Sequence, residues 1–203
     1  MGRTRTFDRD AVLAAAANLF RQRGFRDVSI GDLEKATGMV SGSIYNAFGD
    51  KAGLFTAALD HYVHGFVQER LTGMGGDAAR LEDLERLYLS VLEPPLSDGY
   101  GCLINNSIIE FGRSGGIAAA DIDRTLAMVR GAIDDVLRRE LGGAASEADT
   151  TRLLILYHGI LTLSRSPTPL GAMADAVKAE FGRLRQMRGA GRTRPPHPTV
   201  KPL

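Results

Sequence analysis

The sequence predicts an all-α fold in two parts, a short N-terminal domain followed by a longer C-terminal domain. Apolar residues recur every three to four positions along most of the 203 residues, and alternating strand patterns are hard to find. Breaks that contain glycine or proline divide this pattern into segments of helical length. The chain is also long enough to bury a substantial core.

Three short helices are predicted in the first fifty residues. The first covers roughly 8–23 and ends at Gly24. The second begins after Ser29, a favourable N-cap with an acidic residue three positions on, as in a capping box. It ends at Gly38, where a left-handed residue is needed, and the third helix covers about 40–47.

The later predicted helices are longer. The fourth begins after Asp50 and continues to about 71, so at ~1.5 Å per residue it spans about 30 Å and can join two regions. The final segment, 189–203, has four prolines and no acidic residue, and we predict a disordered basic tail. Between them, the breaks separate helices that we expect near 79–92, 102–112, 117–141, 146–164 and 170–188.

Charge is spread unevenly, although the net charge is only +1. Residues 1–60 carry a net charge of +1, residues 61–182 carry −6, and residues 183–203 carry +6. The positive charge therefore sits in an N-terminal arm and a C-terminal tail around an acidic body. This distribution favours a small contact surface for nucleic acid at one end of the molecule.

The composition excludes several classes of protein. Hydrophobic residues make up 44% and charged residues 24%, as in ordinary globular proteins. No apolar run approaches the ~20 residues of a membrane helix, and the first residues lack the apolar core of a signal peptide. Cys102 is the only cysteine, so no internal disulfide can form. We therefore expect a cytoplasmic protein with no membrane partner.

Two short helices joined by a glycine-bearing turn, with one helix before them, form a helix-turn-helix. Here the stretch is FDRDAVLAAAANLFRQRGFRDVSIGDLEKATGMVSGSIYNAFGDKAGLF. Over about residues 7–55 it resembles the TetR family of bacterial transcriptional repressors. The residues that carry the resemblance are Leu19, Phe20, Gly24, Phe25, Ser29, Ile30, Asp32, Leu33, Gly38, Gly42, Ser43, Ile44, Tyr45, Phe48, Lys51 and Leu54.

The sequence departs from the family pattern at four positions. Ser41 stands where the family often has a lysine or arginine, and Ala47 where it often has a histidine or tyrosine. Val40 replaces a usual serine or alanine, and Glu34 a usual alanine. Two contacts to phosphate or base are thus missing, which leaves the target sequence open.

The resemblance implies a fold and a function for the whole chain. Residues 1–50 would form a three-helix DNA-binding domain, and residues 51–188 a helical ligand-binding and dimerisation domain. The protein would be a homodimeric repressor of a palindromic double-stranded operator, released by an unknown small-molecule effector. It would have no catalytic residues, cofactor or metal, and it would not be an enzyme.

The expected recognition helix carries no positive charge, so its DNA contacts must use other groups. Phosphates accept hydrogen bonds from hydroxyls, from backbone N–H groups and from helix N-termini. Asparagine can bond adenine bidentately, serine is permissive towards bases, and arginines on an arm can reach a neighbouring groove. Taken singly, any of these residues could instead be a packing or surface residue. The expected DNA contacts are Arg3, Arg5, Ser29, Ser41, Gly42, Ser43, Tyr45, Asn46 and Lys51.

The effector pocket is expected among aromatic and polar residues of the longer helices. Glu110 lies on an otherwise apolar helix, and its partner would be either a ligand or Arg113 or Arg130 in a structural network. For any one aromatic residue, a place in the core is the simpler alternative. The tentative ligand-binding residues are Tyr62, Phe66, Tyr88, Cys102, Asn106, Glu110, Phe111, Met128 and Tyr157.

The last two predicted helices are candidates for dimerisation. The first of them is apolar almost all round, so it needs burial on more than one side, and the second has one apolar stripe. In TetR-like proteins such a pair joins its symmetry mate in a four-helix bundle. The residues that this implies are Leu156, Ile160, Leu170, Ala174, Val177, Phe181 and Leu184.

Two functions of other classes remain open. Cys102 lies at a predicted helix start, where a lowered thiol pKa would suit a helical redox protein or enzyme, although the sequence offers no partner base. A purely architectural DNA binder is disfavoured by the acidic body and the long second domain. His61 and His64 are spaced to share a metal ion, but no third ligand follows at metal-site spacing.

Overall fold

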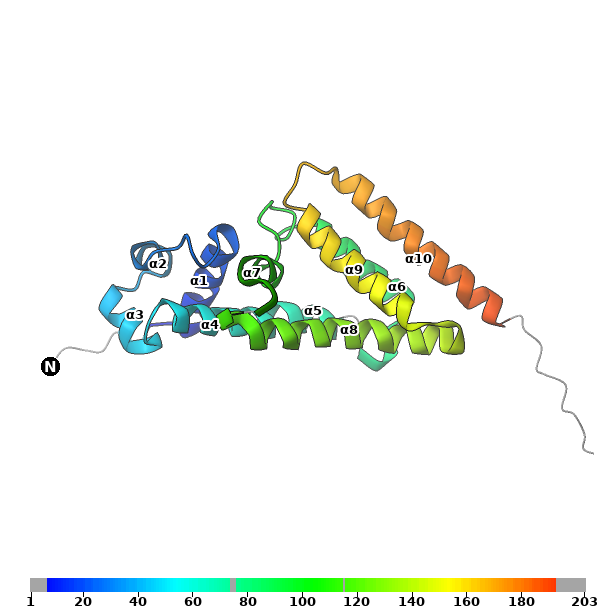
Figure 1. Cartoon of the computed structure of the whole chain (residues 1–203), viewed down its shortest axis with the longest axis horizontal. Coiled ribbons are helices and arrows are strands. Elements are labelled where there is room, and N and C mark those ends of the chain that lie inside the picture. The colour runs from blue at the N-terminus through cyan, green and yellow to red at the C-terminus, as the bar shows by residue number, and fades with distance from the viewer. Residues whose placement is uncertain (1–6, 74–75, 115, 193–203) are drawn as a thin grey trace, which may run out of the picture.

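The computed structural model describes residues 7–73, 76–114 and 116–192, and in this part of the chain it contains helices and turns but no strand (Figure 1). The predicted all-α fold is confirmed. No helix among these residues is long and apolar enough to cross a membrane. The α-helices are α1 (Arg9–Arg23), α2 (Ile30–Thr37), α3 (Ser41–Phe48), α4 (Lys51–Tyr62), α5 (Glu69–Thr72), α6 (Leu81–Leu89), α7 (Leu103–Phe111), α8 (Ala119–Leu141), α9 (Glu147–Leu163) and α10 (Leu170–Arg192).

The N-terminal helices begin and end where the capping residues of the sequence place them. The Asp8 carboxylate accepts hydrogen bonds from the first turn of α1. Ser29 and Asp32 form a reciprocal capping box at the start of α2, in which each side chain accepts from the other residue's backbone N–H. Gly38 ends α2 in the left-handed conformation with φ of 70°, which favours glycine. Local capping chemistry thus sets the geometry of the helix-turn-helix.

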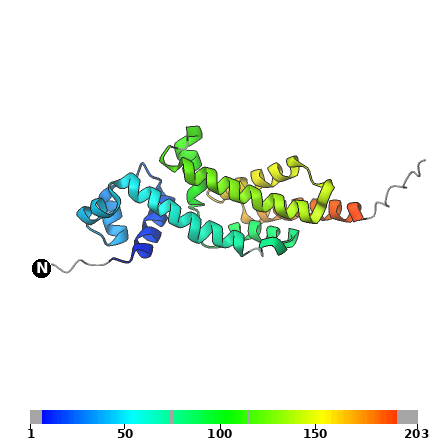
Figure 2. The same ribbon diagram turned by 90° about the horizontal axis from the view of Figure 1, so that it is seen from below.

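The fourth predicted helix is not a single α-helix. It runs as α4, then as a π-helical segment, η1 (Val63–Gln68), and then as α5, and the three form one continuous element beside α8 (Figure 2). The π segment contains Gly65, a weak helix former, and such segments are frequent at functional sites. The element joins the N-terminal helices to the C-terminal domain, as its predicted length requires.

The C-terminal domain is built from α6 to α10 around a core of aromatic and aliphatic side chains. Tyr88 of α6 is fully buried, its ring centroid lies 5.2 Å from that of Tyr157 and 5.3 Å from that of Phe181, and its hydroxyl donates to the Leu153 carbonyl. The three rings join α6, α9 and α10 into one packed unit. Helix α10 extends to Arg192, so residues 189–192 are helical and do not belong to a disordered tail as predicted.

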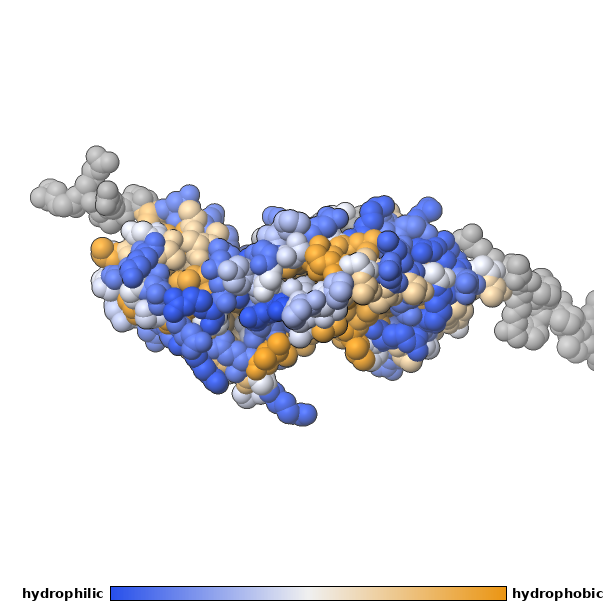
Figure 3. Space-filling view, turned by 90° about the horizontal axis from the view of Figure 1, so that it is seen from above, coloured by the Kyte–Doolittle hydropathy of each residue, from blue (hydrophilic) through white to orange (hydrophobic). Residues whose placement is uncertain are grey.

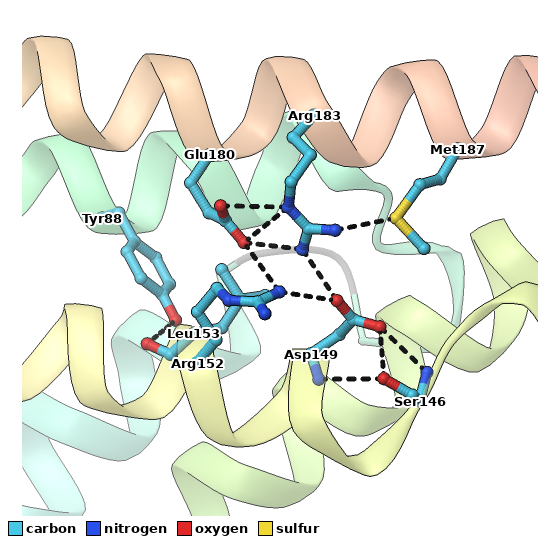
Figure 4. A network of polar contacts seen from close by, with 8 residues as sticks. All are labelled: Tyr88, Ser146, Asp149, Arg152, Leu153, Glu180, Arg183 and Met187. Atoms are coloured by element: carbon cyan, nitrogen blue, oxygen red, sulfur yellow. Dashed lines mark hydrogen bonds and ion pairs between the residues drawn. The ribbon is translucent and has the colours of Figure 1, made fainter.

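A polar network fastens α9 to α10 beside this core (Figure 4). Asp149 accepts from the Ser146 hydroxyl, from Arg183 Nη2 at 2.7 Å and from Arg152 Nη1 at 3.0 Å. Glu180 lies one turn before Arg183 on α10 and accepts from the same guanidinium. Burial alone would raise the pKa of the Asp149 carboxyl, but the hydrogen bonds from Ser146 and Arg183 outweigh burial and lower the pKa to about 2.

Candidate DNA-binding face, effector pocket and dimer face

The helix α3 presents an exposed face without charge. Ile44 is fully buried on the side of α3 that packs against α4 and α2, whereas Gly42, Ser43, Tyr45 and Asn46 are exposed. Half of the Tyr45 surface is exposed, and a Cβ at Gly42 would meet no atom within 4 Å. The expected contact residues of α3 therefore share one accessible surface, on which hydroxyl, amide and backbone groups are free to reach a phosphate or a base edge.

Glu34 explains one departure from the family pattern. The N-cap of α3 is Val40, whose side chain cannot accept a hydrogen bond. The Glu34 carboxylate on α2 instead accepts from the backbone N–H of Ser41. A carboxylate at a helix N-terminus also interacts favourably with the helix dipole. Glu34 therefore supplies the missing cap of the recognition helix.

Val40 is a surface residue that the sequence analysis did not select. With 67% of its surface exposed, it is an apolar side chain at the start of α3 with nothing packed over it. An apolar side chain in a major groove contacts the methyl group of thymine. The sequence contained a hint of this contact, because Val40 stands at a position where the family usually has a serine or alanine.

Ser29 is engaged within the protein. Its hydroxyl donates to Asp32 Oδ2 at 2.5 Å and accepts from the Asp32 N–H at 3.2 Å. The hydrogen bonds that the Ser29 hydroxyl and the Ser29 backbone N–H donate to this carboxylate, together with Arg23, hold the pKa of Asp32 well below its usual range. Ser29 remains exposed, so its role towards DNA would be added to its role as a cap.

Lys51 is placed differently from the expectation. Its Nζ donates to the carbonyls of Phe25 and Val28, each at 2.9 Å, and lies 4.4 Å from the centroid of the Phe25 ring. The ammonium group is thus used to hold the turn before α2. These bonds use two of the three N–H donors of the ammonium group. The structure therefore gives Lys51 a structural role, and a phosphate contact through the third donor stays a prediction. The other expected charges, Arg3 and Arg5, lie outside the described residues.

A pocket of about 230 Å³ lies where α1 meets the junction of α4 and η1. We call it the junction pocket. Of the expected ligand-binding residues it contains Tyr62 and Phe66, whose rings stack with centroids 5.1 Å apart. The residues that line the pocket but were not among the expected ligand-binding residues are Ala14, Ala17, Asn18 and Arg21 of α1, His61 and Gly65, and Pro95 and Leu96 of the loop before α7.

Among the described residues near the pocket, the Tyr62 hydroxyl has no oxygen or nitrogen partner, and the Cys102 thiol, a weak hydrogen-bonding group, lies beside it. The Tyr62 oxygen is buried, and burial, together with the neighbouring Cys102 thiol, raises the pKa of Tyr62 well above its usual range. The phenol is therefore neutral at physiological pH and can both donate and accept. A buried hydroxyl without a partner is costly, and a ligand or water would satisfy it.

Four other residues expected to bind a ligand are occupied by the protein itself. Tyr88 belongs to the aromatic core described above, as does Tyr157, whose pKa burial also raises. Asn106 Nδ2 donates to the carbonyls of Arg21 and Tyr100, and Glu110 accepts from the backbone N–H groups of Phe25 and Arg26. Neither Arg113 nor Arg130 is the partner of Glu110.

The remaining three expected ligand residues also lie away from the junction pocket. Phe111 packs into an aromatic cluster with Phe25 and Phe55, at centroid distances of 5.8 and 5.7 Å. Met128 lines a separate hollow between α8 and the stretch formed by α5 and the end of η1. Cys102 is buried as the N-cap of α7 and makes no side-chain capping bond. Among the described residues, no three potential metal ligands come together.

The expected dimer face needs a correction. Val177, Phe181 and Leu184 are fully buried within the single chain, because the apolar stripe of α10 packs inward against α6. Ile160 is also buried, with 3% exposed. Val177, Phe181 and Leu184 therefore belong to the core of the single chain, whereas the small exposed part of Ile160 lines the groove described next.

A different set of apolar residues is exposed on α9 and α10. Ile155 is 68% exposed, Leu163 45% and Leu170 41%, and Leu156 is half-buried. Figure 3 shows hydrophobic patches interrupting the hydrophilic surface of the C-terminal domain. An almost wholly apolar groove of about 380 Å³, which we call the α9–α10 groove, is lined by Ile155, Leu156, Gly159, Ile160, Leu163, Thr168, Ala172, Met173 and Ala176.

Parts of this sequence are similar to known proteins. The family model described as "Bacterial regulatory proteins, tetR family" matches residues 12–58. The chain is 46% identical over 65 residues to the HTH-type transcriptional repressor ComR of Escherichia coli K12, covering 32% of this chain and 31% of ComR. It is 33% identical over 113 residues to the uncharacterized HTH-type transcriptional regulator YezE of Bacillus subtilis 168, covering 54% of this chain and 58% of YezE. The matches thus span about a third to somewhat over half of these relatives.

The structural comparison extends over most of the chain. A cysteine mutant of the TetR family transcriptional regulator CifR, complexed with 26bp double-strand operator DNA, superimposes with a TM-score of 0.74 and 24% sequence identity. The match covers 89% of this chain and 98% of that one. At this identity the likeness establishes the shared fold, including the helical domain beyond the residues that the family model matches.

Proposed function

The chain belongs to the TetR family of bacterial regulatory proteins, and from this premise we propose that it is a repressor that binds a palindromic operator as a homodimer and is released by a small molecule. The observation that carries the proposal is the exposed, uncharged face of α3 beside the N-terminus of α2. The relatives named above are regulators of transcription. Operator DNA in a bacterial cell lies in the cytoplasm, which is the proposed location.

The proposed operator contacts combine positioning and base recognition. Ser43 and the Tyr45 hydroxyl are exposed donors for phosphate oxygens, together with the N-terminus of α2 at Ser29. Gly42 lets the α3 backbone approach the groove. Asn46 and Ser41 are the proposed hydrogen-bonding readers of bases, and Val40 adds an apolar contact to a thymine methyl. Arg3 and Arg5 of the arm would supply charge in the neighbouring groove.

The proposed dimer forms through the α9–α10 groove. Its lining is almost entirely apolar, and exposed apolar patches of this kind mark interaction surfaces. Gly159 and Ala176 allow a partner helix to approach closely. A second copy would present the same surface, as a two-fold interface requires. Leu156, Leu170 and Ala174 remain in this proposal, whereas the inward stripe of α10 does not.

The junction pocket is the proposed effector site. Its volume is at the small end of the range of about 300–1,000 Å³ for drug-sized ligands, so we expect a compact effector. The lining is mainly apolar with a few polar groups, among them the Tyr62 phenol. These features favour a small, largely apolar molecule that carries one hydrogen-bonding group. Because α1 forms one wall, a bound molecule would act directly on the DNA-binding helices.

Selection of bound DNA from a random library by the full-length protein tests the proposed function. We expect enrichment of a near-palindrome whose half-sites lie about one helical turn, roughly 10 base pairs, apart. The binding stoichiometry should be one dimer per site. Recovery of sequences with no shared motif would contradict the proposal and would favour an architectural DNA binder.

A further inference from the structure

The turn between α1 and α2 is held by a residue of the C-terminal domain. Phe25 and Arg26 donate their backbone N–H groups to Glu110 Oε2 and Oε1, and both distances are 2.8 Å. Each carboxylate oxygen therefore receives one hydrogen bond, across a separation of 85 and 84 residues in the chain. Gly24 makes room for this contact, since a Cβ there would lie 3.0 Å from Glu110 Oε2.

The carbonyl groups of the same turn are held from the other side. Lys51 of α4 donates hydrogen bonds to the carbonyls of Phe25 and Val28, as described above. The Phe25 ring packs against Phe55 of α4 and Phe111 of α7, the neighbour of Glu110. Hydrogen bonds to charged groups are stronger than those between neutral groups. The turn is thus fixed by an ammonium group from α4 and a carboxylate from α7.

Helix α7 makes further contacts along the same side. Asn106 lies one turn before Glu110, and its Nδ2 donates to the Arg21 carbonyl at the end of α1 at 3.0 Å. Cys102 lies one turn earlier still, beside the Tyr62 hydroxyl near the junction pocket. Residues four apart share one face of a helix. The face formed by Cys102, Asn106 and Glu110 therefore runs from the pocket region to the turn before α2.

We propose that Glu110 is the positioning residue that sets the angle of the DNA-binding helices relative to the C-terminal domain, and so the spacing of the two recognition helices in the dimer. This inference rests on the proposed function. A dimer gains affinity when both half-sites are engaged at once, and the gain depends on the geometry of the connection between them. Loosening the turn removes that geometric gain and leaves the contacts of each α3 with its own half-site intact.

The test compares Glu110→Gln with Asp123→Asn in the full-length protein. Both substitutions replace a carboxylate by an amide and remove one negative charge, and Asp123 is an exposed residue of α8. Glutamine offers one acceptor oxygen, while its NH2 group faces the second backbone N–H as donor against donor. Affinity is measured by fluorescence anisotropy at one salt concentration, for the selected operator and for a single half-site. Hydrogen exchange reports on the amides of Phe25 and Arg26.

We expect Glu110→Gln to weaken binding to the full operator by about tenfold while half-site binding stays within about twofold, because only the linkage between half-sites is lost. Exchange at Phe25 and Arg26 should accelerate, and Asp123→Asn should behave as the wild type. Glu110→Asp, which keeps the charge but is one methylene shorter, should show the same selective loss and replaces Glu110→Gln if that protein does not fold.

Two results would overturn the inference. One is an unchanged affinity of the Glu110 variants for the full operator. The other is an equal loss for operator and half-site, which would show that Glu110 only supports the folding of the DNA-binding helices. If the wild-type protein selects no operator from the random library, the proposed function itself is wrong. This outcome concerns the wild type alone, so it can be told apart from the two results on the Glu110 variants.

Discussion

At the scale of single residues, the least expected assignment is that of Lys51. Its position in the family pattern and its positive charge favour a phosphate contact, yet its Nζ lies within 2.9 Å of two carbonyl oxygens. The sequence shows that a lysine is present at this position, but it does not show which groups the ammonium at the end of its long side chain contacts. Glu34 is the opposite case, because an acidic residue that looks unfavourable near DNA caps the recognition helix.

Lys51→Met should therefore destabilise the protein. The loss of two charge-assisted hydrogen bonds should lower the free energy of unfolding by roughly 1–3 kcal/mol, measured by urea denaturation at fixed protein concentration. Lys35→Met is the matched control, since Lys35 is an exposed lysine on α2. Equal unfolding curves for the two variants, with weaker binding to all DNA only for Lys51→Met, would restore the role of phosphate contact.

Asn46→Ala should relax base preference without a general loss of binding. One position in each half-site is expected to lose discrimination by about 1–3 kcal/mol, as measured by competition between operators with single base changes. Ser43→Ala is the contrasting variant and should weaken binding to every sequence alike. A uniform loss for Asn46→Ala would mean that Asn46 does not read a base.

At the scale of helices, the sequence predicted well where most helices begin and end. It predicted poorly what each helix face packs against. Capping residues such as Ser29 and Gly38 act locally, so the sequence carries their signal. The stripe of α10 that contains Phe181 was identified, but periodicity does not tell whether a stripe packs inside the chain or against a second copy. The same holds for Glu110, whose partners lie 84 and 85 residues away. The π segment η1 was also missed, because the sequence analysis distinguished helices from strands and loops but not α-helical from π-helical turns.

The exposed side of α9 and α10 yields a prediction about assembly. Ile155→Glu places a charge on the apolar groove and should give a folded monomer, since Ile155 is 68% exposed in the single chain. Sedimentation at micromolar concentration, with circular dichroism for helix content, measures both properties. Ile117→Glu makes the same change at an exposed isoleucine near α8 and should remain dimeric. A wild-type monomer would remove the basis of this prediction.

The network between α9 and α10 predicts a dependence of stability on pH. The pKa of Asp149 is lowered to about 2, below the ordinary value of about 3.9, so its ionised form stabilises the fold above about pH 5. This contribution, roughly 2 kcal/mol, is lost as the pH falls towards 2. Asp149→Asn should therefore be less stable than the wild type at pH 7, and the difference should narrow in acid. Asp135→Asn, at an exposed position of α8, should show no such narrowing.

At the scale of the whole molecule, the proposed DNA-binding face and the C-terminal end of α10 lie far apart (Figure 1). Helix α3 lies near one end, and α10 ends at the other (Figure 1). The acidic middle of the sequence forms the body between them. Only the N-terminal arm therefore starts close to the proposed DNA-binding face.

Removal of residues 1–6 should weaken binding in a salt-dependent way. The proposed dimer would lose four arginine charges, so the slope of log affinity against log salt should become shallower by up to about 3–4. Removal of residues 193–203 also takes two positive charges from each chain, Arg194 and Lys201, and should leave the slope unchanged. If both truncations have the same effect, the arm has no specific contact with the operator.

The hydrogen bonds that cross from α7 and its preceding loop to α1 limit how far such regulators can exchange parts. A hybrid protein that combines residues 1–50 with the C-terminal domain of another regulator would lose Glu110 and Asn106. The guanidinium of Arg21 would also lose Asp98 and the carbonyl of Gly101. Its DNA-binding helices could still pack on α4, but they would lack these hydrogen-bond partners, both the acceptors and the Asn106 donor. A working hybrid therefore needs the segment from Asp98 to Glu110 from the same parent as residues 1–50. The part that has to be transferred consists of two segments that are separate in the chain.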